Sequence, residues 1–395
     1  MTTHRSTIRY SAFAITAPGL SGFAAGELTA LGVRVGEVDG AGVAFEADAR
    51  TLARANMRLR TVSRILVRID EFRAATFHEL QKRAARIEWG RWIAPGREVT
   101  LRVTCRKSRL YHSGAVAQRV AERLAPIAGR VVSGAGDTAA DSGDEPNDVA
   151  DAQLLVVRLV NDRCTISLDS SGALLHQRGY RLASGKAPLR ETLGSALLLA
   201  SGWVPGEPLV DPFCGSGTLA IEGAMMARRI APGRRRHFAM ERWPAIDCEI
   251  VDQVRAEALD GELSAAGAPI FASDRDAGAI AAARSNAERA GVASDIRFAV
   301  QPVSALQLPD GTTTAGALVT NPPYGVRVSH GGELRNLYAR AGVVLRSVCP
   351  GWRLALVAAD RRLVGQLGIP LTDAVRTTNG GIAVTFAVGE IPALP

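Results

Sequence analysis

From about residue 190 onward, short apolar runs alternate with longer stretches rich in helix-forming residues, and this alternation limits the choice of fold more than any other feature. Apolar runs of strand length that are separated by helices are typical of a parallel sheet covered on both faces. The runs lie at 208–210, 269–273, 317–320 and 352–359, and helical stretches lie at 217–229, 277–290 and 333–347. The last stretch, 374–388, contains Asn379-Gly380, a dipeptide that favours a hairpin turn. We therefore expect a mostly parallel α/β sheet that ends in an antiparallel hairpin.

The first 170 residues have a different texture, in which short strands and helices follow one another without long apolar runs. Strands are expected at 11–16, 33–38, 42–45, 62–70, 99–105, 153–160 and 164–169, and helices at 19–31, 77–87 and 113–124. The stretch 133–151 is rich in Gly, Ser, Asp, Ala and Thr and has no periodicity, so we expect a mobile loop there. Three domains follow from these changes of texture, at 1–60, 61–170 and 171–395.

Composition narrows the class of protein. A chain of 395 residues is too long for one ordinary core, and 47 Lys and Arg against 39 Asp and Glu give a net charge of +8, which favours a polyanionic partner. Five scattered cysteines without a C-x-x-C pair, and six scattered histidines, predict neither disulfides nor a metal site and suit a reducing cytoplasm. No apolar run approaches the roughly 18 residues of a membrane span.

A Gly-x-Gly turn follows the first apolar run, in Leu209-Val210-Asp211-Pro212-Phe213-Cys214-Gly215-Ser216-Gly217-Thr218. Glycines let the backbone pass close to a ligand at the carboxyl edge of a sheet, where open α/β sheets bind ligands. A nicotinamide cofactor is the weaker candidate, because the third glycine of G-x-G-x-x-G is missing and Asp211 would lie near a pyrophosphate. S-adenosylmethionine has no phosphate and carries an ammonium group. We expect it to contact Asp211, Phe213, Cys214, Gly215, Gly217 and Thr218.

A second acidic segment, Ser273-Asp274-Arg275-Asp276, ends the next apolar run. A carboxylate at this edge can accept hydrogen bonds from both ribose hydroxyls, so Asp274 is the expected ribose ligand, and Arg275 is expected beside the adenine. Asp276 precedes the helical stretch 277–290 and is a good N-cap residue. The alternative for Asp274 is that it is a second capping residue.

The run Asn321-Pro322-Pro323-Tyr324 indicates the reaction. An exocyclic base amine is a poor nucleophile because its lone pair is delocalised into the ring. The Asn321 side chain and the Pro322 carbonyl can accept its two N–H hydrogens and aim the lone pair at a sulfonium methyl, while Pro323 stiffens the loop and Tyr324 offers a stacking face. These four residues are the expected catalytic set, and by themselves they do not distinguish adenine from guanine.

Basic segments could contact phosphates in this positively charged chain. One is Arg106-Lys107-Ser108-Arg109, and another is Arg234-Arg235-Arg236-His237. A third, His176-Gln177-Arg178-Gly179-Tyr180-Arg181, precedes a helix whose first turn is expected to bring Arg190, Glu191 and Thr192 to the cofactor.

Taken in order, H-Q-R-G-Y-R, A-P-L-R-E-T-L, D-P-F-C-G-S-G-T-L-A-I-E, S-D-R-D and N-P-P-Y-G resemble the THUMP-domain RNA methyltransferases, most of all those that methylate guanine N2 in bacterial 23S rRNA. The resemblance covers nearly the whole chain. It implies a ferredoxin-like piece at 1–60, a THUMP RNA-binding domain at 61–170 and a Rossmann-like methyltransferase domain with a seven-stranded sheet. It also implies RNA contacts by Arg106, Lys107, Arg109, Tyr111, His112, Arg178 and Arg181.

One departure from the family pattern concerns adenine recognition. Family members usually place an acidic residue after the third strand of the sheet, where this chain has Val300-Gln301-Pro302-Val303-Ser304. Either Gln301 or a backbone group would replace it.

Three alternatives to rRNA guanine methylation remain at this point. The same chemistry could act on tRNA, and an N-P-P-Y loop also serves adenine-N6 methylation of DNA, although the RNA-binding front end argues against the latter. From a different class, the chain could be a non-catalytic RNA-binding or assembly factor with a vestigial cofactor pocket.

Overall fold

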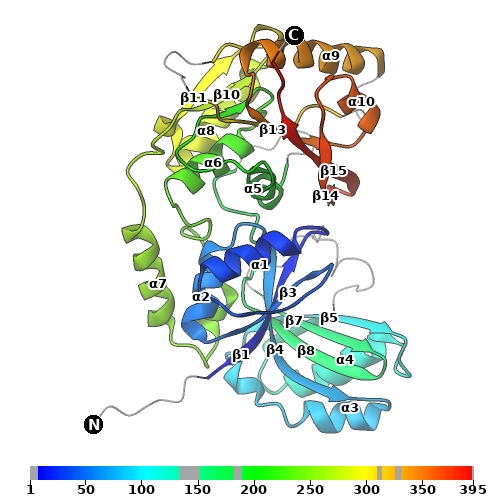
Figure 1. Ribbon diagram of the computed structural model, residues 1–395. Helices are drawn as coiled ribbons and strands as arrows, with labels where there is room; N and C mark the ends of the chain where they lie inside the picture. Colours follow the sequence, from blue (N-terminus) through cyan, green and yellow to red (C-terminus); the bar gives the residue numbers. More distant parts are fainter. Residues whose placement is uncertain (1–7, 134–151, 182–188, 309–313, 325–330, 394–395) are drawn as a thin grey trace. The chain divides into compact units, whose positions relative to one another are not determined.

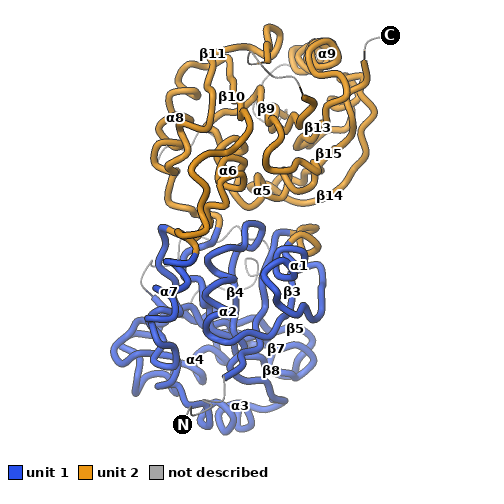
Figure 2. Tube along the Cα trace, turned by 60° about the vertical axis from the view of Figure 1, so that its left-hand side comes forward, with its two compact units in different colours: residues 1–17, 24–175, 235–257 blue, residues 18–23, 176–234, 258–395 orange. Residues whose placement is uncertain are grey.

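The computed structural model describes residues 8–133, 152–181, 189–308, 314–324 and 331–393, without the side chains of residues 331 and 332 (Figure 1). The loop expected at 133–151 therefore lies almost entirely outside the described residues. The chain divides into two compact units (Figure 2). Unit 1 consists of residues 1–17, 24–175 and 235–257, and unit 2 consists of residues 18–23, 176–234 and 258–395.

Unit 1 is built on one mixed sheet of eight strands in the order β2-β3-β1-β4-β8-β7-β5-β6. Its strands are β1 (Tyr10–Thr16), β2 (Val35–Val38), β3 (Gly42–Ala47), β4 (Val62–Arg73), β5 (Glu98–Arg106), β6 (Arg130–Ser133), β7 (Gln153–Val160) and β8 (Arg163–Asp169). The helices of this part of the chain are α1 (Ser21–Ala30), α2 (Ala49–Arg58), α3 (Phe77–Ala84) and α4 (Ser113–Leu124), with a 3₁₀ turn at Trp89–Arg91. Because the long strand β4 pairs with both β1 and β8, the elements on either side of residue 60 share one sheet.

Helix α2 escaped sequence prediction because its apolar residues are few. Asp48 caps it by accepting a hydrogen bond from the Thr51 backbone N–H at 2.7 Å, and Leu52 and Met57 are buried on its inner face. The helix thus has an ordinary cap and a narrow apolar stripe, which a search for long apolar periodicity misses.

The segment 235–257 belongs to unit 1, although the sequence was divided so that it fell in the third domain. Trp243 anchors it, with its ring centroid 5.5 Å from that of Trp92 and its indole N–H donating to Gln153 Oε1 at 2.8 Å. Trp92 also meets Tyr10 edge-on at 5.8 Å. The three-domain division stays a prediction, and the compact units are not consecutive stretches of chain.

Unit 2 confirms the expected sheet. Seven strands lie in the order β11-β10-β9-β12-β13-β15-β14, and pairing is parallel from β11 to β13 and antiparallel at β15 and β14. The strands are β9 (Leu209–Asp211), β10 (Ile270–Asp274), β11 (Ile296–Val300), β12 (Ala317–Thr320), β13 (Arg353–Ala358), β14 (Thr372–Asn379) and β15 (Ile382–Glu390). The hairpin turn is Gly380-Gly381, both at positive φ (57° and 78°), one residue later than Asn379-Gly380.

Helices cover both faces of this sheet (Figure 1). They are α5 (Glu191–Ala200), α6 (Thr218–Ala227), α8 (Ala277–Ala290), α9 (Gly331–Val348) and α10 (Arg361–Gly365), with 3₁₀ turns at Ala293–Asp295 and Val303–Ala305. Most of α7 (Cys248–Asp260) and the 3₁₀ turn at Ala239–Arg242 belong to the segment 235–257 of unit 1. Helices α5, α6 and α8 pack together on one face. Helices α9 and α10 share a core with Val210, Phe271 and Leu318 on the other face.

Gly342 in α9 allows a close approach that any side chain would block. A Cβ at this position would lie 1.9 Å from the Leu367 carbonyl oxygen, a backbone atom that cannot move aside by rotation. We expect Gly342→Ala to lower the free energy of unfolding by about 1–3 kcal/mol in urea titration. Gly26→Ala in α1 is the matched control, because nothing lies within 4 Å of its Cβ. That change should be neutral or stabilising, by up to about 1 kcal/mol. Equal stability of the two variants would show that this approach is not tight.

Candidate active site

A cavity of about 1190 Å³ lies in unit 2 at the carboxyl ends of β9, β10 and β12. The strand order reverses here, because the chain runs outward from β9 to β10 and β11 on one side and to β12 and β13 on the other. Open α/β sheets bind ligands at such a point. Of the residues predicted from the sequence, those in the cavity wall are Asp211, Phe213, Cys214, Gly215, Thr218, Asp274, Arg275, Asn321 and Pro323.

The glycine turn adopts a conformation that other residues would resist. Gly215 and Gly217 have φ of 51° and 86°, and a Cβ on Gly217 would also lie 3.0 Å from that of Ala283. Gly217 ends the turn and α6 begins at Thr218. A Cβ on Gly215 would meet nothing within 4 Å, so the backbone there faces open space in the cavity wall.

Asp211 is a buried carboxylate, 2 % exposed, at the end of β9. Its Oδ1 accepts hydrogen bonds from the Thr320 hydroxyl at 2.7 Å and from the Phe213 backbone N–H at 3.2 Å. Burial, helped by the neighbouring charge of Asp274, raises the pKa of Asp211 to about 7, although these two hydrogen bonds lower it. A cation bound beside Asp211 would relieve this cost.

Asp274 closes the glycine turn against β10. Its Oδ2 accepts from the Gly215 backbone N–H at 3.0 Å and its Oδ1 accepts from the Asp276 backbone N–H at 3.0 Å. A carboxylate offers about four acceptor positions, so Asp274 can still accept two ribose hydroxyls. The capping role belongs to Asp276, as predicted, since its Oδ1 accepts from the Ala279 N–H at 3.0 Å.

The loop Asn321–Tyr324, predicted to be catalytic, presents one buried acceptor without a partner among the described residues. Asn321 lies in the cavity wall, and its Oδ1 is buried and has no hydrogen-bond partner within the described part of the chain. Buried acceptors are nearly always paired, so this atom is a candidate ligand contact. Pro322 is buried and Tyr324 is half-buried, and neither lines the cavity with Asn321 and Pro323.

The segment 300–304, in which the sequence lacks the expected acidic adenine contact, contributes Pro302, Val303 and Ser304 to the cavity wall. Gln301 does not line the cavity, although its Oε1 is buried and without a partner among the described residues. The geometry thus favours a backbone group or Ser304 over the Gln301 side chain as a substitute adenine contact.

One wall of the cavity was missed from the sequence. Helix α9 contributes Glu333, Leu334, Asn336, Leu337 and Arg340, which repeat at helical spacing. Their spacing places them on one helix face. The available signal was this spacing directly after the Asn321–Tyr324 loop, whereas the sequence analysis gave only a helical stretch at 333–347.

The cofactor contacts expected of the α5 start stay a prediction. Of this region only Leu189 lines the cavity, whereas Glu191 and Thr192 are buried and Arg190 lies outside the wall. Glu191 forms an ion pair of 3.3 Å with Arg181, and burial raises the pKa of Glu191.

Two of the residues predicted to contact RNA have partners within the protein; Arg178 is buried and Arg181 is half-buried. Arg178 is 3 % exposed and its Nε lies 3.6 Å from Glu222 Oε1. Arg181 donates to the Leu189 carbonyl and to the Thr218 hydroxyl. These partners hold both side chains in place, so the packing disfavours an RNA contact by either residue, and such a contact stays a prediction.

The remaining RNA candidates lie on the surface of unit 1, just after β5. Arg106, Lys107, Arg109, Tyr111 and His112 are exposed, the Arg109 side chain by 74 % and Tyr111 by 69 %. Asp162 fixes this loop by accepting from the Arg109 backbone N–H at 2.7 Å. The Tyr111 and His112 rings lie 4.0 Å apart.

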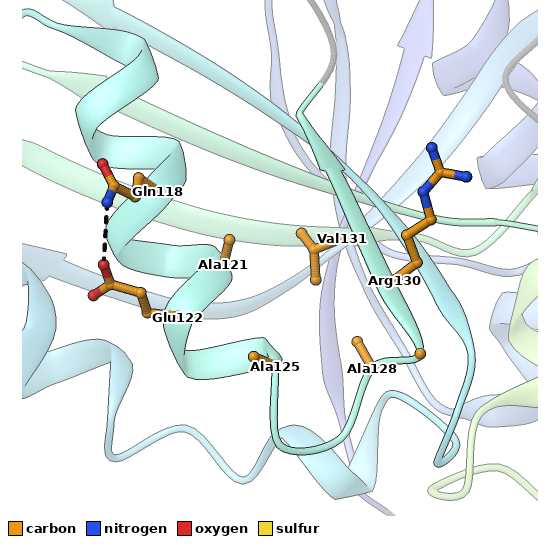
Figure 3. Close-up of a pocket in the computed structure, with 8 residues that line it drawn as sticks. Gln118, Ala121, Glu122, Ala125, Ala128, Arg130 and Val131 are labelled. Carbon is orange, nitrogen blue, oxygen red and sulfur yellow. Dashed lines mark hydrogen bonds between the residues drawn. The ribbon is translucent and has the colours of Figure 1, made fainter.

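A second hollow, between α4 and β6 in unit 1, has a volume of about 360 Å³ (Figure 3). Small residues such as Ala121, Ala125 and Ala128 line most of it, with Glu122 and Arg130 at its edges. It offers no acid–base pair or buried unpaired acceptor. Across the described ranges there is also no group of three His, Cys, Asp or Glu that could hold a metal ion. No helix in the described parts of the chain is both long and apolar enough to cross a membrane.

The residues of the cavity in unit 2 fit S-adenosylmethionine: a buried carboxylate in need of a cation, an open glycine turn and a second carboxylate with spare acceptors. Fold and site together define an S-adenosylmethionine-dependent methyltransferase.

Comparison with known proteins agrees. The RMKL-like methyltransferase domain matches residues 178–385, and the RlmL ferredoxin-like domain matches residues 11–66. The chain belongs to the RMKL-like methyltransferase family and carries a ferredoxin-like domain near its N-terminus.

Three relatives are similar over almost their whole length. The chain is 32 % identical over 383 residues to slr0064 of Synechocystis, provisionally named an RNA methyltransferase, with 96 % of each chain covered. The structure of SMU.472, described as a candidate methyltransferase in complex with SAH, is similar with a TM-score of 0.83 at 26 % identity, covering 98 % of this chain and 99 % of that one. A Listeria monocytogenes structure, described provisionally as an N6-adenine-specific DNA methylase, has a TM-score of 0.78 at 30 % identity, covering 96 % of each.

The raised pKa of Asp211 leads to a pH-dependent affinity. An ammonium group binds the deprotonated carboxylate, so below the pKa of about 7 binding must first displace a proton. Affinity for S-adenosylhomocysteine, measured by calorimetry, should fall about tenfold per pH unit below pH 7 and level off above it. Asp211→Asn should weaken binding at pH 8 and flatten this profile. It should also stabilise the ligand-free protein at pH 8, because the folded state then no longer holds a buried charge. A wild-type profile unchanged between pH 5.5 and 8 would contradict this account.

Proposed function

We propose that this methyltransferase transfers the methyl group to the exocyclic N2 amine of a guanine in structured RNA, with 23S rRNA as the first candidate. This proposal rests mainly on Asn321, which lies in the wall of the cofactor cavity. Its Oδ1 atom is a buried acceptor without a partner among the described residues. A planar amine supplies the N–H that this acceptor lacks. The cavity of about 1190 Å³ is larger than usual for one small ligand, which leaves room for a base beside the cofactor.

S-adenosylmethionine supplies an electrophilic methyl group on a sulfonium. The chain's own residues orient the reactants: Asp211 holds the ammonium group, Asp274 holds the ribose, and Asn321 with the Pro322 carbonyl accepts the two N–H hydrogens of the amine. Rate enhancement then comes from alignment and fixed dipoles. The nitrogen loses a proton after it is methylated, when it is acidic, so no strong base is required at the site.

RNA is favoured as substrate by the name of the Synechocystis relative and by the exposed basic loop at 106–112. We propose that this loop, with residues 61–170 as a THUMP domain, contacts the RNA backbone. The enzyme must then draw the guanine out of its stack to reach N2.

Two rival substrates are tested by the same measurement. tRNA could carry the target guanine, and DNA adenine is suggested by the description of the Listeria structure. Nucleosides from rRNA, tRNA and DNA of a deletion strain, compared with wild type by mass spectrometry, should lack N2-methylguanosine in rRNA alone. Loss of N2-methylguanosine from tRNA, or loss of N6-methyladenine from DNA, would contradict the rRNA assignment and identify that nucleic acid as the substrate. An unchanged profile would favour a non-catalytic RNA-binding factor.

Replacing Asn321 tests the amine clamp. Asn321→Leu and Asn321→Ala remove the acceptor and should lower kcat at least about a hundredfold, whereas Asn321→Asp keeps an acceptor and should lose less. Calorimetric affinity for S-adenosylhomocysteine should change little in all three variants. Turnover of Asn321→Ala near the wild-type level would rule out the clamp.

Replacing the exposed basic side chains tests the RNA surface. Lys107 has a positive φ of 48°, so Lys107→Asn removes its charge while suiting that backbone, and Arg109→Ala removes a second charge. The double variant should bind structured RNA more weakly. The slope of the logarithm of its binding constant against the logarithm of salt concentration should become shallower by roughly 1 for each lost phosphate contact. Arg130→Ala, on edge strand β6, removes an equally exposed charge and should leave both unchanged. Because Arg130→Ala removes one charge and the double variant removes two, an effect of Arg130→Ala about half that of the double variant would point to net charge alone.

A further inference from the structure

The catalytic loop is anchored immediately before Asn321. Thr320, the last residue of β12, donates its hydroxyl hydrogen to Asp211 Oδ1 at 2.7 Å, and Thr320 is 3 % exposed. The loop therefore leaves the sheet from a point that is fixed to the cofactor-binding strand β9.

Two further side chains hold the loop immediately after Asn321 and Pro322. The Tyr338 hydroxyl of α9 donates to the Pro323 carbonyl oxygen at 3.3 Å. The Asn379 side-chain amide, at the end of β14, donates to the Tyr324 hydroxyl oxygen at 3.0 Å. Both anchors come from elements that follow the loop in the sequence, α9 and β14, and neither side chain lines the cavity itself.

Both anchoring side chains are buried, Tyr338 at 2 % and Asn379 at 4 % exposure. A buried polar group is costly without a hydrogen-bond partner, so each side chain is confined to the orientation that reaches the loop. Burial raises the pKa of Tyr338, which keeps its hydroxyl protonated and able to donate.

Asn379 is held in turn by the hairpin. It pairs with Ile382 across the two-residue turn Gly380-Gly381, whose positive φ angles make the tight reversal of the chain possible. The turn residue suggested by the sequence is therefore the last residue of a strand, with its side chain aimed at Tyr324. A residue inside the turn would only have to adopt the backbone angles of the turn, whereas Asn379 also uses its side-chain amide as a hydrogen-bond donor.

We infer that Asn379, together with Tyr338, is a positioning residue for methyl transfer. Its bond to the Tyr324 hydroxyl fixes the aromatic ring and, through the short loop, the Asn321 acceptor, so that the target amine meets the methyl group in line. This inference rests on the proposed function of the loop. Misplacement of a reacting group by about 1 Å can cost on the order of a hundredfold in rate, so a single hydrogen bond at this place has a large effect.

A double-mutant cycle with Tyr324→Phe and Asn379→Leu tests the bond and its consequence separately. The first readout is the thermal unfolding midpoint of the full chain, which needs no substrate. Each single variant leaves a buried group unpaired or removes the bond, so each should lower the midpoint, and the double variant should lose less than the sum.

The second readout is the single-turnover rate of methyl transfer to RNA from a strain lacking the gene, with saturating S-adenosylmethionine. Asn379→Leu should lower this rate about tenfold or more, while affinity for S-adenosylhomocysteine stays within about twofold. In the Tyr324→Phe background the same change should have no further effect, because the hydroxyl it orients is gone. Tyr338→Phe should also lower the rate and spare the affinity.

Thr377→Val is the matched control on β14. Thr377 is buried at 5 %, and its Oγ1 has no partner among the described residues, so valine replaces it without breaking a bond. Its rate should equal that of the wild type.

The outcomes separate the two proposals. Three results would each overturn the positioning role. They are additive changes in the unfolding midpoint, a wild-type rate for Asn379→Leu, and a loss of rate in Thr377→Val equal to that in Asn379→Leu. If the wild type itself transfers no methyl group to RNA, the proposed function fails, and the midpoint cycle alone then decides whether the Asn379–Tyr324 bond holds the loop.

Discussion

The hydrogen bond between Thr320 and Asp211 is the contact on which the organisation of unit 2 depends. It joins the ends of β9 and β12, the two strands between which the order of the sheet reverses. One partner carries the carboxylate proposed for the cofactor and the other begins the catalytic loop. The low exposure of both residues makes the bond strong and its loss costly. Cofactor and amine sites are thereby fixed to one another through two adjacent strands, and not through a mobile connection.

The cost of this arrangement is a carboxylate with a pKa near 7 in the ligand-free protein. Burial that destabilises the charged form of Asp211 also makes the site selective for a ligand that brings a positive charge. The same logic applies to Asn321, whose unpaired acceptor is unfavourable until a donor arrives. A buried carboxylate that favours a cation and a buried acceptor that favours a donor thus indicate the chemistry of the ligand that the cavity binds. Functional sites commonly keep such groups at the expense of stability.

Near Asp211 and Asn321, other charged and polar side chains hold the surrounding segments in place through ion pairs and hydrogen bonds. Ion pairs behind the cavity join Arg178 to Glu222 and Arg181 to Glu191. Hydrogen bonds from Asn379 on β14 and Tyr338 on α9 reach the loop at 321–324. Sequence patterns made the arginines look like phosphate contacts, because charge in a basic protein suggests the surface. The carboxylates that neutralise them, Glu191 on α5 and Glu222 on α6, lie ten or more residues away along the chain, so only packing reveals their role. By contrast, the exposed loop at 106–112 keeps the surface character that its composition indicated.

The amino-acid sequence by itself determined the α/β sheet with its terminal hairpin, the strand–turn–helix units at Asp211 and Asp274, the Asp276 cap and the N-P-P-Y loop. These features depend on local periodicity, glycine and proline conformation and short motifs, which neighbouring residues fix. Only the tertiary structure decided that Gly380-Gly381 forms the turn, that residues 235–257 return to unit 1 through Trp243, and that α9 forms a cavity wall. It alone also left Asn321 Oδ1 without a partner among the described residues and joined Asn379 to Tyr324, 55 residues apart. Such contacts arise from the order of strands in a sheet, and a linear pattern does not contain that order.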